Sequence, residues 1–89
     1  IDKDYKTLAR SILSAFEIDI SSAVIDEALD LYDHFDDGSN PAPLVKVKDD
    51  LYVSELWHGP TRAFKDMALQ PFGKVLSSLA QDRNEEYLI

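Results

Sequence analysis

The sequence predicts an α/β fold built from two helices, a β-hairpin, a third helix and the start of a strand. Three observations carry this prediction. Apolar residues recur at helical spacing in residues 5–16, 24–35 and 63–80. Two β-prone runs flank Asp49-Asp50, as in a hairpin. A polar stretch then ends in the apolar run Tyr87-Leu88-Ile89, which is typical of the first residues of a buried strand.

The first two helices have clear start signals. Asp4 can cap a helix that runs to about Phe16, because its carboxylate can accept a backbone N–H of the first turn. Ser21 or Ser22 can cap a second helix in the same way. We expect Gly38 to end this second helix, since glycine is the preferred residue just beyond a helix C-terminus.

The hairpin is predicted from two runs rich in β-branched and aromatic residues, Leu44–Lys48 and Leu51–Leu56. Asp49-Asp50 forms the turn between them, although Asp-Asp is a weaker turn pair than Asp-Gly. Trp57–Thr61 is expected to be a loop, because Gly59 and Pro60 together favour a tight, stiff turn.

The third helix is predicted from about Ala63 to about Ala80. Pro71 and Gly73 lie inside it and should kink or distort it, because proline removes a backbone donor. Phe72 is expected to be a core residue.

Both ends of the sequence lead us to expect an incomplete segment, residues 1–89, of the N-terminal region of a larger enzyme. The chain begins at Ile1, and it stops inside the strand that Tyr87 opens. A buried strand ending there would leave unpaired backbone groups on an apolar edge. The alternative is a complete small domain whose last strand adds to a sheet.

Composition excludes several classes of function. The net charge is −8, from 17 acidic and 9 basic residues, and no basic stripe is present, so neither nucleic acid nor a membrane is an expected partner. There is no cysteine, and no apolar run reaches the ~20 residues of a membrane span, so a cytoplasmic protein is expected. Asp30 and His34 share a helix face, but no third ligand accompanies them, so no metal site is predicted.

Residues 55–73 carry the chemistry. They contain the runs His58-Gly59-Pro60-Thr61, Ala63-Phe64-Lys65-Asp66 and Ala68-Leu69-Gln70. This segment closely resembles the cofactor-lysine segment of the threonine synthases, pyridoxal-phosphate enzymes of the tryptophan-synthase β-like fold (fold type II). The order of helices and strands in residues 4–56 also fits that family.

The resemblance implies a lyase of amino-acid biosynthesis that converts O-phospho-L-homoserine and water to L-threonine and phosphate. Lys65 would be the catalytic residue, holding pyridoxal 5′-phosphate as a Schiff base and moving protons, and Phe64 would lie against the cofactor ring. The family's Ser-Gly-Asp-Thr-Gly loop and its phosphate cradle lie outside these residues. The segment would therefore need the remainder of its own chain, and alone it is expected to be inactive.

The residues around Lys65 are consistent with this role. A lysine in the first turn of the predicted third helix meets the positive end of the helix dipole, which favours the neutral amine that cofactor attachment needs. Asp66 opposes this effect, and the sequence does not predict its orientation. Thr61 fits a helix cap as well as a pocket residue.

Three further side chains of this segment are interpreted as structural or solvated rather than catalytic. We interpret His58 as a structural loop histidine bonded to backbone rather than as a proton carrier. Arg62 is interpreted as a solvated side chain rather than a phosphate ligand, and Trp57 as core. Trp57, Arg62 and Pro71 also depart from the residues usual in the family, which leaves the detailed shape of the pocket open.

Two alternatives remain open. Another pyridoxal-phosphate lyase of the same fold would keep Lys65 and change the substrate. A non-catalytic acidic interaction domain would use the carboxylates between Glu17 and Asp37, a stretch without a lysine or arginine. The second alternative explains the charge but not residues 57–70.

Overall fold

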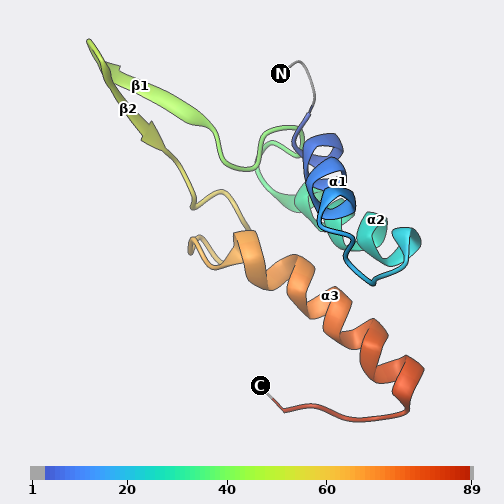
Figure 1. Ribbon diagram of the computed structural model, residues 1–89. Helices are drawn as coiled ribbons and strands as arrows, with labels where there is room; N and C mark the ends of the chain where they lie inside the picture. The colour runs from blue at the N-terminus through green and yellow to red at the C-terminus, as the bar shows by residue number, and fades with distance from the viewer. Residues whose placement is uncertain (1–3, 89) are drawn as a thin grey trace.

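The computed structural model describes residues 4–88 and confirms a small α/β arrangement of three helices and a two-stranded sheet. The elements are α1 (Tyr5–Ala15), α2 (Ser22–Asp30), the 3-10 turn η1 (Leu31–His34), β1 (Leu44–Lys48), β2 (Leu51–Ser54) and α3 (Asp66–Arg83). In Figure 1 the hairpin extends away from the helices, and the described chain measures 53 × 28 × 18 Å along its principal axes.

The predicted caps of α1 and α2 are confirmed. The Thr7 N–H donates to the Asp4 carboxylate at 2.8 Å, and the Val24 N–H donates to Ser21 Oγ at 3.3 Å. Each bond satisfies a first-turn donor that has no partner inside its helix. Of the two candidate serines, Ser21 is therefore the cap of α2.

The predicted end of the second helix is wrong. The α-helix stops at Asp30, tightens into η1, and gives way to extended backbone at Phe35 rather than continuing toward Gly38. Tertiary contact decides this. The Asp36 N–H donates to the His58 carbonyl at 3.1 Å, so a bond to a distant loop replaces the next helical one.

The hairpin has the predicted antiparallel pairing, with Lys48 opposite Leu51 across the Asp49-Asp50 turn. Asp49 adopts a left-handed conformation with φ 43°, which aspartate tolerates better than most residues. The second strand ends at Ser54 rather than Leu56. The Glu55 N–H still donates to the Pro43 carbonyl at 2.9 Å, but Pro43 has no N–H to donate in return, so the ladder stops there.

Helix α3 begins three residues later and ends three residues beyond the predicted limits. Its start is delayed because the backbone before Asp66 makes turn bonds instead of helical ones: the Asp66 N–H donates to the Ala63 carbonyl at 3.1 Å, and the Met67 N–H donates to the Phe64 carbonyl at 3.2 Å. It ends at Arg83 and is capped by Asn84, which is left-handed with φ 52°, and the Glu85 N–H donates to the Ala80 carbonyl at 2.9 Å. The helix runs without interruption through Pro71 and Gly73.

The predicted strand start at Tyr87 is not formed. Residues 85–88 are irregular, and Leu88 is fully exposed, while Ile89 lies outside the described residues. A strand exists only where a neighbouring strand pairs with it, and β1 and β2 pair with each other instead.

The core lies where α2 and η1 meet α1 and the start of α3. Leu29, Tyr32 and Phe35 are buried, and Tyr32 makes edge-on contacts with Tyr5 and Phe35, at ring-centre distances of 5.0 and 5.1 Å.

The prediction that Trp57 and Phe72 are core residues is wrong for the described chain. They are 46% and 48% exposed. Trp57 lies in the loop beyond β2, outside this helical contact. Phe72 lines the same hollow as Ile25 and Leu29 of α2, but it is only partly covered there.

Candidate functional site

Lys65 lies at the junction between the loop and α3. It occupies the capping position just before the helix, rather than the first turn as predicted, and its carbonyl accepts the Leu69 N–H at 2.8 Å. Lys65 is exposed, and the neighbouring Phe64 is 65% exposed. The two site residues predicted from the sequence are thus adjacent on an open surface of the described chain.

Asp66 is the residue that organises this junction, and its orientation was not predictable from the sequence. The residue is buried, at 2% exposure, and its carboxylate accepts hydrogen bonds from the Thr61 N–H and the Thr61 hydroxyl, both at 2.8 Å. Gln70 donates to its other oxygen at 3.1 Å. Thr61 is therefore not the helix cap, which was one of the two roles that its sequence position fitted. It binds the first residue of the helix from the loop.

The electrostatics of Asp66 follow from these bonds. Burial alone raises the pKa of the Asp66 carboxyl, but the hydrogen bonds from Thr61 and Gln70 outweigh burial and lower its pKa overall. The position at the start of α3 also favours a negative charge. The site therefore holds a carboxylate in its ionised form.

Gly59 belongs to the same cluster. A Cβ at Gly59 would lie 2.5 Å from Asp66 Cβ and 2.6 Å from Asp66 Oδ2, closer than real Cβ contacts. The glycine of the His-Gly-Pro-Thr run is thus required by the close approach of Asp66. The motif residues Gly59, Thr61, Asp66 and Gln70 form one packed and hydrogen-bonded unit, which we call the Asp66 cluster.

His58 is held between two carboxylates. Its Nδ1 lies 2.8 Å from Asp36 Oδ2, and its Nε2 lies 2.8 Å from Glu55 Oε1. Both bonds are satisfied together only by a doubly protonated ring, and the Asp36 and Glu55 carboxylates raise the pKa of His58. The predicted structural role fits this geometry, but the ring bonds to side chains rather than to backbone.

Arg62 is not simply solvated. It donates to Asp36 Oδ2 at 2.6 Å, and this bond, followed by that from His58, lowers the pKa of Asp36. We call the group of His58, Asp36, Glu55 and Arg62 the His58 clamp, because it joins the end of η1, the end of the hairpin and the loop before Lys65. Asp36 was missed at the sequence level because it is 22 positions from His58.

Other carboxylates of the acidic stretch are also paired within the chain. Lys6 contacts Asp30 at 3.0 Å and Asp33 at 2.7 Å, and Lys74 contacts Glu27 at 2.8 Å. Much of the negative charge is therefore matched by bases from α1 and α3. Among residues 4–88, no group of three or more His, Asp or Glu side chains is arranged so that it could hold a metal ion.

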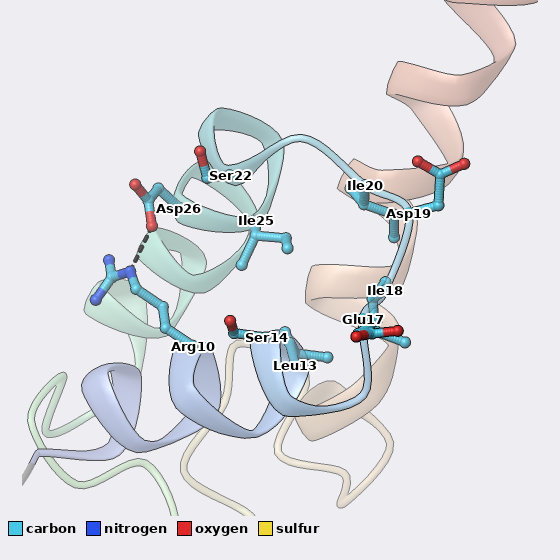
Figure 2. Close-up of a pocket in the computed structure, with 10 residues that line it drawn as sticks. All are labelled: Arg10, Leu13, Ser14, Glu17, Ile18, Asp19, Ile20, Ser22, Ile25 and Asp26. Atoms are coloured by element: carbon cyan, nitrogen blue, oxygen red, sulfur yellow. Dashed lines mark hydrogen bonds and ion pairs between the residues drawn. The ribbon is translucent and has the colours of Figure 1, made fainter.

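A cavity of about 660 Å³ lies elsewhere, at the turn between α1 and α2. Figure 2 shows Leu13 and Ile25 beside it and Arg10 bonded to Asp26 at its edge. Lys65 is not among its lining residues, so the cavity is separate from the chemistry-bearing loop. No helix in the described part of the chain is long and apolar enough to cross a membrane.

Comparison with known proteins finds relatives that are named as threonine synthases. The chain is 34% identical over 91 residues to threonine synthase of Methylobacillus glycogenes, and 36% identical over 81 residues to threonine synthase of Escherichia coli. These alignments cover 92% and 90% of this chain but only 19% and 18% of the relatives. Threonine synthase-like 2 of Xenopus laevis is 38% identical over 47 residues, 53% of this chain and 10% of that protein.

The chain thus spans about a fifth of the length of the curated relatives that it matches along most of its sequence. No family model matches it, and no solved structure matches it. The relationships in sequence confirm the resemblance predicted from residues 55–73, and they identify the chain as a segment related to the threonine synthases.

Proposed function

We propose that the protein carrying this segment is a threonine synthase of fold type II, with Lys65 as the covalent anchor of pyridoxal 5′-phosphate. The observation that carries the proposal is the exposed Lys65 at the end of a loop braced by the Asp66 cluster. Relatives named threonine synthase match along nearly the whole chain.

The residues present fit the cofactor as an anchor and part of a pocket wall. Lys65 offers a primary amine on an open surface, and Phe64 offers an apolar ring beside it. Pyridoxal phosphate, when bound, supplies the electron sink for elimination of phosphate from O-phospho-L-homoserine and addition of water. In this proposal Lys65 would hold the cofactor through Nζ, and the same amine would accept and donate protons.

The test is phosphate release from O-phospho-L-homoserine by protein expressed from the full reading frame. We expect Lys65→Ala to abolish release of phosphate and formation of threonine. Lys74→Ala, which removes an α3 lysine bonded to Glu27, should retain both. Full activity in Lys65→Ala contradicts the proposal.

A second candidate is a related lyase of the same fold acting on another phosphorylated substrate. The match to threonine synthase-like 2 favours keeping it in view. It predicts no threonine from O-phospho-L-homoserine, and phosphate release only from its own substrate. An acidic interaction domain predicts neither product, and the pairing of its carboxylates with Lys6 and Lys74 weighs against it.

The 89-residue chain by itself is expected to release no phosphate, because Lys65 and Phe64 are exposed and not enclosed by a pocket. Release of phosphate by the purified 89-residue chain, above the rate of its Lys65→Ala variant, would contradict this expectation.

A further inference from the structure

We propose that Asp66 is a positioning residue that fixes the direction in which Lys65 presents its amine. This inference rests on the proposed function of Lys65 and deepens it. Asp66 does not touch the reacting atoms in this account. It acts through the backbone that it shares with Lys65.

The first argument is the anchoring of the carboxylate. Asp66 is the buried charged residue of the described chain, and both of its oxygens accept hydrogen bonds from neighbours. Thr61 binds it twice, from the loop, and Gln70 binds it from the next turn of α3. Its side chain is thereby held in one orientation from both sides of the junction.

The second argument is the shape of the space around it. Gly59 leaves room that a Cβ would fill, and Asp66 occupies that room. The loop and the first residue of the helix are therefore fitted to each other. A longer or displaced side chain at either position would move the start of α3.

The third argument is the way the helix start is held. Lys65 occupies the capping position without a side-chain hydrogen bond of its own to the helix. Asp66 thus ties the start of the helix to the 59–61 loop. Because consecutive residues point about 100° apart around a helix, an inward Asp66 leaves Lys65 on the open side.

The experiment measures attachment at Lys65 directly in the full-length protein. Pyridoxal phosphate is added, the lysine amine bonds to its aldehyde carbon with loss of one water, and borohydride reduces the new C=N bond to a secondary amine. Peptide mapping then gives the labelling of Lys65 relative to Lys74. Lys74 lies on the same helix and reports any general unfolding.

We expect Asp66→Asn to lower the Lys65-to-Lys74 ratio on the order of tenfold, because a misplaced reacting group loses its orientation advantage. Thr61→Val, which removes one donor and keeps the carboxylate, should lower it less. Asp82→Asn, an exposed carboxylate on the same helix, should leave it unchanged. If Asp66→Asn does not fold, as judged by circular dichroism, Thr61→Val decides the question.

Two outcomes overturn the inference, and they are distinguishable. A preference for Lys65 that persists unchanged in folded Asp66→Asn and in Thr61→Val overturns the positioning role alone. Equal labelling of Lys65 and Lys74 in the unaltered protein overturns the proposed function, and this inference with it.

Discussion

At the scale of single residues, the loop before α3 shows how strictly a few positions are specified. Gly59 is required by the approach of Asp66, and Thr61 supplies two donors to the same carboxylate. Gly73, in contrast, faces open space, since a Cβ built there meets nothing within 4 Å. Substitution by alanine is therefore expected to destabilise the protein at Gly59 and to stabilise it at Gly73.

Gly59→Ala should destabilise the protein by about 1–3 kcal/mol, because the added methyl group forces Asp66 to move. Gly73→Ala should stabilise it by about 1 kcal/mol, because alanine has the higher helix propensity and the site is open. Urea unfolding measures both. Equal effects of the two substitutions would show that Asp66 does not pack on Gly59.

The His58 clamp gives stability a defined pH dependence. Asp36 and Glu55 raise the pKa of His58 above the ordinary value of 6.5, and Arg62 shares Asp36. A raised folded-state pKa means that the stabilisation is fully present below about pH 6.5 and is lost as pH rises through the folded-state value.

The unaltered protein should therefore lose more stability than His58→Gln as the pH rises from about 6 to about 9. Thermal unfolding across this range measures the difference. His34→Gln, which changes the other histidine, should keep the behaviour of the unaltered protein. Identical pH profiles for His58→Gln and the unaltered protein would contradict the clamp.

At the scale of elements, Pro71 explains how α3 joins η1. Proline has no N–H, so the Met67 carbonyl one turn earlier lacks its usual helical donor. The Tyr32 hydroxyl donates to that carbonyl. Burial raises the pKa of Tyr32, so its hydroxyl stays protonated at neutral pH and can donate this bond. The Met67 carbonyl, which Pro71 leaves without a helical donor, is thus the acceptor that joins α3 to η1.

Tyr32→Phe should cost about 1–3 kcal/mol, because the Met67 carbonyl is left without a donor. In a Pro71→Ala background the same change should cost less, because the backbone N–H of the new alanine restores the helical bond to that carbonyl. Urea unfolding of both single variants and the double variant measures the coupling. Strict additivity of the two changes would contradict this link between α3 and η1.

At the scale of the whole molecule, the buried apolar residues lie in α2, in η1 and in the segment that follows, where Phe35 and Pro41 are buried. Leu29, Tyr32 and Phe35 form the core, whereas every residue of β1 and β2 is exposed. An isolated two-stranded hairpin is marginally stable in water. In the 89-residue chain, stability therefore resides in the helices, and the hairpin contributes little.

Leu29→Ala should destabilise the 89-residue chain by about 2–5 kcal/mol, since it opens a cavity in the core. Leu44→Ala removes the same side chain from a hairpin position that is 66% exposed, and should change stability by less than about 0.5 kcal/mol. Equal losses in the two variants, measured by urea unfolding, would place the core elsewhere.

The sequence by itself determined the features that depend on neighbours within a few positions. Short spacings predicted the cap at Asp4, a cap of the second helix at Ser21 or Ser22, the hairpin across Asp49-Asp50 and the motif around Lys65. Such features involve hydrogen bonds and side-chain periodicity along one stretch of chain, which the order of residues specifies directly.

The tertiary structure decided what depends on residues far apart in the chain. The early end of α2, the clamp on His58 and the burial of Tyr32 rest on contacts across 22 to 35 positions. The inward turn of Asp66 rests on the loop that packs against it. At each of these positions, burial and hydrogen bonds to distant residues outweigh the local preference of the backbone for helix.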